Sequence, residues 1–501
     1  MKIVVFDPNS TMIPQFGVMI DEALVAKKNG HDVTYITCGG CLDSCYSNPL
    51  KSKMFCKICV SDYKSNLTKF LGVDFQHKTL NDFSSIEFEQ ELENYDFKFE
   101  TLADLKMKTF KGIDVGYAAL SSFISNTRNM NPVLSPFCHD ILFKMLKSAV
   151  RLSLLCEKID KMEKPDKIYV YNGRLPESRP FLRYFRAKGI DVHILEDYPT
   201  NLTGSFKKIT YLNDLPHSIS YFQKKLDEEW LKNESKAHEL GSKFFQNRRN
   251  ASFAGDKVYV KDQKTGLLPK EWNPKMRNIV IFNSSEDEFA AVGTDWENKL
   301  FHSQIEGINH IFKCAEKYPN TEVYLRIHPN LKKIKYKYHT DLYTISNNTR
   351  VHVISADSEV STYALVDAAE VVVSFGTSVG VEAAYSAKSV VLIGAAFYKG
   401  LGFCYEPKTI SEMEDQVFTN TLKPLSSSYV LKYGNYIMCD KGQDFSHYNF
   451  NCTQFTFGKF RTPNVAMIDQ AISTFSLIKS FCMRVWRELQ RKYLKFIINE
   501  V

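Results

Sequence analysis

Short hydrophobic runs alternate along this chain with longer helical stretches, and turn-forming residues separate them. The first run covers 3–6 and ends in the turn formers at 7–10; a helical stretch over 16–29 stops at Gly30, and a second run covers 31–37. Continuous apolar runs bounded by turn formers are typical of buried strands. A strand, a helix and a strand in this order predict a βαβ unit, whose right-handed crossover makes the two strands parallel.

The same alternation returns twice further along the chain. A strand is predicted over 167–171, a helix over 179–188 and a strand over 191–195, which ends at Glu196. After a proline-containing linker the pattern restarts, with strands predicted at 278–282, 323–327, 351–354, 371–373 and 390–393, and helices at 299–317, 360–368 and 381–386. Repeated alternation of this kind is typical of doubly wound sheets. The sequence therefore predicts an α/β fold with two Rossmann-like domains.

The pattern divides the chain into three parts. An N-terminal Rossmann-like domain is predicted over 1–268, a C-terminal Rossmann-like domain over 275–460, and a basic amphipathic helical tail over 464–501. A chain of 501 residues exceeds the length at which a single hydrophobic core stops growing, so more than one domain is expected.

The predicted tail has two interpretations. Its last part mixes large apolar residues such as Trp486, Leu489 and Phe496 with basic residues such as Arg487 and Lys492. A basic amphipathic helix can lie on an anionic lipid surface. It can equally pack on the protein body with its charged face in solvent, and the sequence leaves both interpretations open.

Composition narrows the function classes. Lys and Arg number 64 against 57 for Asp and Glu, which gives a formal net charge of +7. This excess suits small anionic ligands or a membrane surface and is too diffuse for a nucleic-acid-binding protein. The chain opens on a strand instead of a signal peptide, and no run approaches the roughly 20 apolar residues that span a bilayer. The sequence therefore predicts a cytoplasmic protein, with contact at the inner face of the membrane as an option.

A cysteine-rich loop over 38–59 follows the second predicted strand. In a reducing compartment, clustered cysteines indicate metal binding rather than disulfides, and spacings such as Cys56-Lys57-Ile58-Cys59 are those of a metal knuckle. A structural zinc ion is the first interpretation, an iron–sulfur cluster the second, and unligated thiols the third. The predicted ligands are Cys38, Cys45, Cys56 and Cys59, with Cys41 as an alternate.

The strongest local signal follows the predicted strand 371–373, where glycines and hydroxyl-bearing residues meet the start of a helix. Glycines let a phosphate approach the backbone, and the amides and dipole of a helix start favour an anion. The other interpretation is a tight turn with a Ser or Thr N-cap. The residues predicted to bind a nucleotide here are Ser374, Gly376, Thr377, Ser378, Gly380 and Glu382, the last as an acceptor for ribose hydroxyls.

A second candidate loop ends the predicted strand 323–327. Pro329 stops the strand and presents His328 at the rim of the sheet, where the imidazole can donate to a phosphate oxygen. Arg326 or Lys332 would neutralise a diphosphate leaving group.

A third candidate loop follows the predicted strand 278–282. The hydroxyl and amide groups of Ser284 and Ser285 are predicted to contact the donor phosphates. The acidic residues at 286–288 would repel a phosphate, so they are expected to cap a helix or to handle the acceptor.

Together these motifs resemble a known family. The segments "RIHPN", "SFGTSVGVEAAYSAKSVVLIG", "FNSSEDE" and "YNGRLPESRP" are similar to segments of bacterial capsule and O-antigen (lipopolysaccharide) biosynthesis proteins. These proteins are GT-B-fold glycosyltransferases related to the capsule Kdo-transferase group. The resemblance is best over 278–394 and weaker around 167–196 and at the N-terminus. It implies two Rossmann-like domains facing a cleft, and a donor site without a catalytic metal, because helix termini and basic side chains offset the charge of the leaving group.

The resemblance also assigns site residues. It implies that His328 and the residues after strand 371–373 line the nucleotide site. On the acceptor side it implies Asn172, Gly173, Arg174 and Arg179, together with Asp7 at the end of the first strand. A carboxylate at a strand end suits a general base that deprotonates the acceptor hydroxyl. Glu196 ranks first for this role, ahead of Asp7, Glu286 and Asp287, and His328 is the other predicted catalytic residue.

The sequence thus predicts a glycosyltransferase. It would move a sugar from a nucleotide-activated donor to a bacterial surface polysaccharide or its polyprenyl-linked precursor. On the same fold, a UDP-sugar 2-epimerase and a polyol-phosphate transferase are alternatives, and a non-catalytic polysaccharide-assembly protein is a third. An epimerase would act on the free UDP-sugar and need no acceptor.

Overall fold

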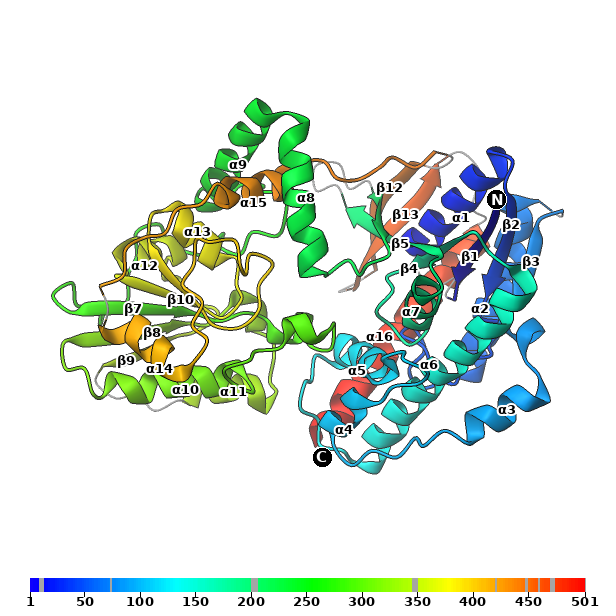
Figure 1. The fold of residues 1–501 in the computed structure, drawn as a ribbon, viewed down its shortest axis with the longest axis horizontal. Coiled ribbons are helices and arrows are strands. Elements are labelled where there is room, and N and C mark those ends of the chain that lie inside the picture. The colour runs from blue at the N-terminus through cyan, green and yellow to red at the C-terminus, as the bar shows by residue number, and fades with distance from the viewer. Residues whose placement is uncertain are drawn as a thin grey trace. The chain divides into compact units, whose positions relative to one another are not determined.

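The computed structural model divides into two compact units. It describes residues 1–8, 13–72, 74–199, 206–344, 350–419, 421–446, 449–457, 460–468 and 474–500. Unit 1 comprises Met1–Pro216 and Lys441–Val501, and unit 2 comprises His217–Asp440. Each unit is built around its own sheet (Figure 1).

Unit 1 contains a six-stranded sheet in the order β3-β2-β1-β4-β5-β6. Its strands are β1 (Lys2–Asp7), β2 (Asp32–Thr37), β3 (Gln76–Thr79), β4 (Lys167–Tyr171), β5 (Asp191–Pro199) and β6 (Phe206–Leu212). All neighbours pair in parallel except β5 and β6. The chain therefore reverses its direction of winding between β1 and β4, which is the topological switch point of this sheet.

Helices cover this sheet, and a hairpin lies outside it. The helices of unit 1 are α1 (Ile13–Lys28), α2 (Lys53–Leu71), α3 (Ile86–Glu93), α4 (Leu102–Met107), α5 (Val115–Thr127), α6 (Pro136–Glu163), α7 (Arg179–Ala187) and α16 (Thr474–Glu500). Strands β12 (Asn449–Phe457) and β13 (Phe460–Ile468) form the antiparallel hairpin.

Unit 2 contains a five-stranded parallel sheet in the order β11-β10-β7-β8-β9. Its strands are β7 (Arg277–Phe282), β8 (Thr321–Arg326), β9 (Val351–Ile354), β10 (Val371–Ser374) and β11 (Ser389–Leu392). If the strands of each unit are numbered from 1 along the chain, both sheets have the order 3-2-1-4-5, to which unit 1 adds its sixth strand at one edge. The switch point of unit 2 therefore lies between β7 and β10.

Both faces of the second sheet are buried, and alternate residues of its strands enter the core on opposite sides. In β7, Ile279 and Ile281 belong to one core cluster, whereas Val280 and Phe282 belong to the other. Side chains of a strand point alternately to opposite faces, so a strand buried on both sides is apolar throughout. This is why the continuous apolar runs of the sequence predicted these strands closely.

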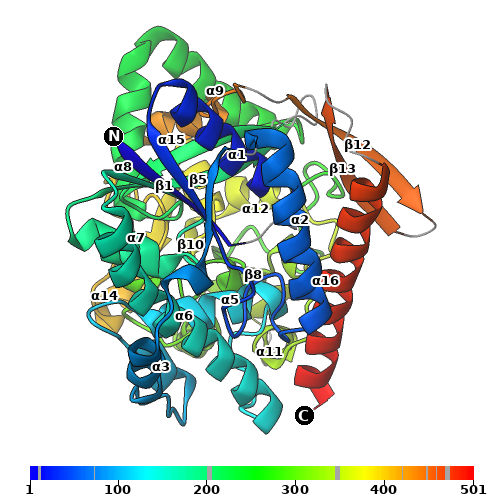
Figure 2. The same cartoon turned by 90° about the vertical axis from the view of Figure 1, so that its right-hand side faces the viewer.

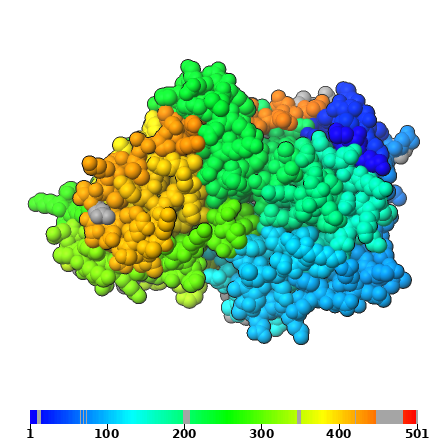
Figure 3. Space-filling model, in the orientation of Figure 1, coloured from blue at the N-terminus to red at the C-terminus, as the bar shows by residue number. Residues whose placement is uncertain are grey.

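The helices of unit 2 form the two outer layers. They are α8 (Ile219–Lys232), α9 (Glu234–Arg249), α10 (Gln304–Ala315), α11 (Lys337–Thr344), α12 (Thr362–Ala368), α13 (Val379–Tyr385), α14 (Ile410–Glu414) and α15 (Tyr429–Met438). Two of them, α8 and α9, precede the predicted linker, yet they pack beside α15 at the surface of unit 2 (Figure 3).

The domain boundaries therefore differ from the predicted ones. Phe222 of α8 and Phe244 of α9 share a core cluster with Tyr433 of α15, so 217–268 belongs to unit 2 and the first boundary lies at 216 instead of 268. At the other end, the backbone of Lys208 pairs with that of Gln443 (N to O, 2.9 and 2.7 Å), and residues 441–460 join unit 1. Sequence periodicity shows where helices are but not which core their apolar faces enter.

The fold class is confirmed: the chain is a mixed α/β protein with two parallel Rossmann-like sheets and a helical C-terminal region. The tail helix, α16, begins at Thr474, ten residues later than predicted, because 460–468 forms strand β13. No helix among the described residues is long and apolar enough to cross a membrane.

One face of α16 packs on unit 1 (Figure 2). Met483 and Leu494 are buried, and Arg491 Nε donates to Asn126 Oδ1 of α5 over 2.8 Å. The opposite face exposes Trp486, Leu489, Tyr493 and Phe496, with Phe496 57% accessible. The helix therefore packs on the body with one face and presents a large apolar stripe on the other.

The close crossing of α9 and α15 generates a stability prediction. A Cβ at Gly241 would lie 2.5 Å from the carbonyl oxygen of Leu431, which is backbone and cannot move aside. Helix propensity alone would favour Gly241→Ala by roughly 1 kcal/mol, but overpacking costs about 1–3 kcal/mol. We expect Gly241→Ala to lower the free energy of unfolding in denaturant titrations. Gly293→Ala is the control, because its backbone is extended and nothing lies within 4 Å of the added Cβ. Equal free energies of unfolding for the two variants would contradict the close packing of α9 on α15 at Gly241.

Candidate functional site

A pocket opens in unit 2 at the carboxyl ends of β7, β8 and β10, at the switch point of the sheet. Its empty volume is about 490 Å³, part of which is open to solvent. Asn283 follows β7, His328 follows β8, and Thr377 and Ser378 follow β10. Ligands of open α/β sheets bind in the crevice at this position. All residues that line the pocket belong to unit 2, so its geometry is set within one compact body.

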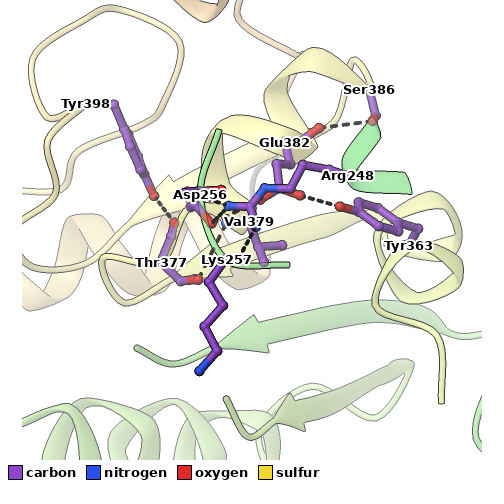
Figure 4. A network of polar contacts seen from close by, with 10 residues as sticks. Arg248, Asp256, Lys257, Tyr363, Thr377, Val379, Glu382, Ser386 and Tyr398 are labelled. Carbon is purple, nitrogen blue, oxygen red and sulfur yellow. Dashed lines mark hydrogen bonds and ion pairs between the residues drawn. The ribbon is translucent and has the colours of Figure 1, made fainter. Parts of the chain in front are cut away.

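A buried ion pair forms one wall of this pocket (Figure 4). Arg248 of α9 and Glu382 of α13 are 6% and 5% exposed, and Arg248 Nε lies 3.7 Å from Glu382 Oε1. Ser378 Oγ donates to Glu382 Oε1 over 3.0 Å, and the hydroxyl of Tyr363 donates to Oε2 over 2.6 Å. The carboxylate thus accepts two hydrogen bonds and keeps capacity for more, since an ionised carboxylate offers about four lone-pair positions.

Arg248 is itself fixed by several acceptors. Its guanidinium donates to the carbonyl oxygen of Lys257 (2.9 Å), to Asp256 Oδ2 (3.2 Å) and to Ser378 Oγ (3.1 Å). The nearby carboxylates of Glu382 and Asp256 raise the pKa of Arg248 despite its burial, so the side chain stays charged. Arg248 therefore positions Ser378 and Glu382.

The glycines after β10 serve packing more than phosphate approach. Gly376 has φ +79°, in the left-handed region, and a Cβ there would collide with the carbonyl oxygen of Ala395. A Cβ at Gly380 would collide with the hydroxyl of Tyr398. Ser374 is fully buried, and its Oγ lies 2.8 Å from the same Tyr398 hydroxyl. These three predicted nucleotide-binding residues lie outside the pocket lining, so for them the turn-packing interpretation is the one that the structure favours.

The first turn of α13 also differs from the predicted anion site. The amides of Gly380, Val381 and Glu382 donate to backbone oxygens of Thr377 and Ser378, over 3.1 to 3.2 Å. The amide of Val379 faces Thr377 Oγ1 at 3.5 Å. Because these amides already have acceptors within the turn, an anion in the pocket would depend mainly on side-chain donors.

Such donors come from β8 and the loop behind it. His328 Nδ1 accepts from the amide of Asn330 over 3.1 Å, which places the proton of the neutral ring on Nε2. The Arg326 guanidinium is 2% exposed and donates to the carbonyl oxygens of Ser355 and Ser358. Burial lowers the pKa of Arg326 to about 10, so the group is still charged at neutral pH.

Three buried donors that border the pocket have no hydrogen-bond partner: Arg326 Nε, Gln263 Nε2 and Arg248 Nε, the last of which faces Glu382 Oε1 at 3.7 Å. A buried donor without an acceptor costs about 1–3 kcal/mol, so an acceptor-bearing ligand would relieve that cost. The residues that line the pocket include two arginines, Arg248 and Arg326, but one carboxylate, that of Glu382, so positive charge is in excess. The pocket is therefore suited to an anionic ligand rich in acceptors.

The loop after β7 lies in part outside this pocket. The amide of Ser284 donates to Gln304 Oε1, and Gln304 Nε2 donates back to Ser284 Oγ, both over 2.9 Å. Ser285 is buried and donates to Asp287 Oδ1 over 3.1 Å. Neither serine lines the pocket: the hydroxyl of Ser284 is used by Gln304 at the start of α10 and that of Ser285 by Asp287 within the loop. Burial, followed by the charge of Asp287, raises the pKa of Glu286 to about 7.

A second polar cluster forms in unit 1 where β4 ends beside β5. Asn172, at φ +65°, donates from Nδ2 to Glu196 Oε1 over 2.7 Å, and the next residue, Gly173, has φ +74°. Glu196 lies within β5, paired with Ile209 of β6, because the strand runs on to Pro199. Burial and the charge of Asp197 raise the pKa of Glu196 to about 8, against a smaller opposing effect of Arg174. The structure thus brings four of the predicted residues together.

Two other predicted acceptor-side residues are buried away from solvent. Arg179 is 0% exposed and forms a salt bridge with Asp114, over 2.9 Å from Nε to Oδ1. Its guanidinium is therefore occupied by a buried ion pair, and its role on the acceptor side stays a prediction. Asp7 is also fully buried and accepts from the hydroxyl of Tyr35 over 2.8 Å.

Sequence reasoning missed several residues of the pocket. Arg248, Tyr259, Gln263 and Tyr363 all line it, and the ring of Tyr259 lies edge-on to His328, with 5.0 Å between the ring centroids. Arg248 belongs to the basic end of a polar helix that was assigned to the other domain. Its one available signal was a pair of arginines on a helix just before the linker, a pattern common on solvated helices.

The comparison with known families singles out this part of the chain. Residues 256–436 match the family model described as "Capsule polysaccharide biosynthesis protein". The matched residues all lie within unit 2. The match includes the pocket except for Arg248, and it confirms the resemblance that the motifs indicated. No curated protein matches the chain.

Solved structures also show likenesses. KpsC from Thermosulfurimonas dismutans, a beta Kdo 2,4 transferase, is 15% identical, with 55% of this chain and 88% of that chain covered and a TM-score of 0.31. A UDP-N-acetylglucosamine 2-epimerase from Methanocaldococcus jannaschii is 11% identical, with 87% and 97% covered and a TM-score of 0.28. HepE of Anabaena, solved with UDP and glucose, is 12% identical, with 88% and 96% covered and a TM-score of 0.22. The fold assignment rests on the strand orders of the two sheets.

The raised pKa of Glu196 predicts a pH dependence of stability. Its ordinary pKa is 4.5 and its folded pKa about 8, so the folded protein holds this proton more tightly than the unfolded chain does. The contribution of Glu196 to stability is complete below pH 4.5 and is lost as the pH rises to about 8. We expect Glu196→Gln, whose amide oxygen can still accept from Asn172, to make the melting temperature fall less between pH 5 and pH 8. The control is Glu100→Gln, at an exposed position. If the melting temperature changes equally with pH in the wild type and both variants, the pKa of Glu196 is not raised.

Proposed function

We propose that the chain is a glycosyltransferase that takes a sugar from a nucleotide-activated donor and adds it to a surface polysaccharide or its lipid-linked precursor. The observation that carries the proposal is the pocket at the switch point of unit 2, which combines two buried arginines, His328 and unpartnered donors. The family match over 256–436 supports the link to capsule synthesis.

The donor would lie in this pocket with its diphosphate toward β8. His328 Nε2 and the Arg326 guanidinium would donate to phosphate oxygens, and Thr377 Oγ1 would add a hydroxyl. Glu382, fixed by Arg248 and Tyr363, would accept from the ribose. When the sugar leaves, negative charge grows on the diphosphate, and donors already in place stabilise that charge without reorganisation. The proposal does not require a metal ion for this step.

The acceptor side would be unit 1, with Glu196 as the base. A base must be ionised to take a proton, and with a pKa of about 8 this carboxyl is mostly protonated at neutral pH and becomes available as a base as the pH rises towards 8. Asn172 holds the carboxylate by a 2.7 Å hydrogen bond, so the side chain has a fixed orientation. Arg174, bonded to Ser121 Oγ over 2.7 Å, carries a positive charge that favours the ionised form of Glu196.

Nucleotide binding tests the donor pocket. In a thermal-shift panel of CMP, CDP, UDP and GDP, we expect at least one nucleotide to raise the melting temperature, because a ligand of the native state stabilises it. His328→Ala should weaken that nucleotide about tenfold or more, since a hydrogen bond to a charged group contributes about 1.5–3 kcal/mol. His302→Ala, at an exposed position outside the pocket, should bind like the wild type.

Three outcomes would contradict the proposal. If no nucleotide binds at millimolar concentration, the pocket is not a donor site and the transferase assignment fails. If a UDP-sugar binds and is converted without any acceptor, the chain is an epimerase and not a transferase. Binding without turnover in the presence of membrane-derived acceptor lipids would favour an assembly protein.

We further propose that α16 contacts an anionic membrane surface. Its exposed stripe of Trp486, Leu489, Tyr493 and Phe496 recurs at helical spacing on one face, and Lys492 is exposed beside it. An amphipathic helix with aromatic residues and basic flanks enters the headgroup region of anionic bilayers. A polyprenyl-linked acceptor would then be reached at the surface of that bilayer.

Vesicle sedimentation tests this contact. We expect the full chain to sediment with phosphatidylglycerol vesicles and less with phosphatidylcholine vesicles, and high salt should weaken the binding. The double substitution Leu489→Glu and Phe496→Glu should abolish sedimentation. Leu231→Glu is the matched control, because Leu231 is a 77% exposed leucine on α8. Unchanged sedimentation of the double variant would refute the contact.

A further inference from the structure

The cysteine-rich loop brings sulfur atoms from two chain segments to one place in unit 1. Cys38, Cys41 and Cys45 lie in the turns that follow β2, and Cys56 and Cys59 lie in the first two turns of α2. Gly40 has φ +79°, and a Cβ at this position would be 4.0 Å from Cys56 Cβ. The turn at 38–41 therefore packs directly on the start of α2.

Asn48 ties the second half of the loop to the same helix. Its backbone amide donates to the carbonyl oxygen of Cys45 over 3.1 Å, and its Nδ2 donates to Cys56 Sγ over 3.3 Å. Its Oδ1 accepts from the amide of Ser52, the N-cap of α2, over 2.9 Å. One asparagine thus fixes Cys45 and Cys56 relative to each other.

Cys45 is tied to the same place as the cysteines of α2. Asn48, which bonds its carbonyl oxygen, also bonds Cys56 Sγ, and Cys59 follows Cys56 by about one turn of the helix on which the 38–41 turn packs. None of the five thiols forms a disulfide. The four sulfur atoms of Cys38, Cys45, Cys56 and Cys59 therefore share one partly buried region.

Cys41 takes a different direction. Its thiol hydrogen-bonds to Ser84 and interacts with the charges of Arg151 and Glu89, although Cys38 is also near. Its neighbours are thus those of α3 and α6 instead of α2. This distinction separates four candidate ligands from a fifth cysteine in the same loop.

We propose that Cys38, Cys45, Cys56 and Cys59 ligate one metal centre. Four cysteines are the complete ligand set of a structural zinc site and of an iron–sulfur cluster. The side-chain amide of Asn48 already donates to one sulfur, as outer partners of metal-bound thiolates do, and Lys51 Nζ donates to the carbonyl oxygen of Gly40 over 2.9 Å. The start of α2 also favours negative charge on Cys56.

The spacing of the sulfur atoms bears on the kind of centre. Two sulfurs on one zinc ion are at most about 4.6 Å apart, because each Zn–S bond is about 2.3 Å. Among the described residues, the group of three or more ligands whose donor atoms all lie within 4.8 Å of one another is His310, Cys314 and Glu414, so no three thiols of the loop reach that spacing. A single zinc ion would therefore have to draw these sulfur atoms closer together than they lie in this structure, and metal analysis distinguishes the two kinds of centre.

The centre would hold together several parts of unit 1. The amide of Tyr46 donates to Glu177 Oε1 over 3.0 Å, and Asn126 Nδ2 of α5 donates to the carbonyl oxygen of Tyr46 over 3.2 Å. The amide of Ser44 donates to Ser148 Oγ of α6 over 2.7 Å. A metal that fixes the loop thus also fixes its contacts with α5 and α6, which is the role of a structural centre.

Metal analysis of the full chain, purified without oxygen, tests the proposal. We expect iron with acid-labile sulfide, or zinc, in stoichiometric amount, and X-ray absorption at the metal edge should show sulfur ligands from four cysteines. Cys45→Ser should lose the metal and lower the melting temperature. Cys41→Ser should keep both, and it is a matched control because it removes a thiol from the same loop.

The proposal is overturned if the wild-type chain holds neither metal and does not bind them on reconstitution with zinc, or with iron and sulfide. Equal metal content in the Cys45→Ser and wild-type proteins would also overturn it. Should Cys45→Ser fail to fold, the sulfur coordination of the wild-type metal decides the matter by itself. Iron with sulfide identifies the cluster, and zinc alone identifies the mononuclear site.

Discussion

The buried pair of Arg248 and Glu382 is the interaction on which the candidate site depends. A charge 6% exposed must be compensated, and removing one partner of such a pair costs about 3–5 kcal/mol, because the other charge is left buried and alone. Arg248 comes from α9 and Glu382 from α13, so the pair fastens the helices that precede the sheet to the helix that follows β10. The same guanidinium holds Ser378, which gives the pocket wall a fixed shape before any ligand arrives.

The fold could be predicted from the sequence wherever burial is complete. Strands β7 and β10 match the prediction to within one residue, because a strand buried between two helical layers reads as a nearly continuous apolar run. The edge strand β3 was missed, since its sequence Gln76-His77-Lys78-Thr79 is polar and its residues are exposed or half-buried. The unit boundary at 216 was also missed. Periodicity shows that α8 and α9 have apolar faces, but their place in unit 2 depends on close packing, such as that of Gly241 in α9 against Gly434 in α15.

The candidate site could be predicted only in part, for a related reason. Strand ends are visible in a sequence, so His328, Arg326, Thr377, Ser378 and Glu382 were found by their positions after β8 and β10. What a side chain does there depends on neighbours that are distant in sequence. Ser374 is one example: its hydroxyl is used by Tyr398, 24 residues further along, which no local pattern indicates. Ser284 is another, since Gln304, 20 residues further along, bonds both its amide and its hydroxyl.

The two sheets share one strand order but differ in the chemistry at their strand ends, and this difference assigns their roles. In unit 2 the pocket at β7, β8 and β10 gathers arginines and N–H donors, which suit a polyanion. In unit 1 the cluster at β4 and β5 gathers Glu196 and Asp197, whose pKa values are raised by burial, beside the fully buried Asp7 at the end of β1. A diphosphate would be repelled by these carboxylates when they are ionised, whereas an acceptor hydroxyl would find a base. The transferase that we propose would use both kinds of strand end, the cationic one of unit 2 for the donor and the carboxyl-rich one of unit 1 for the proton of the acceptor.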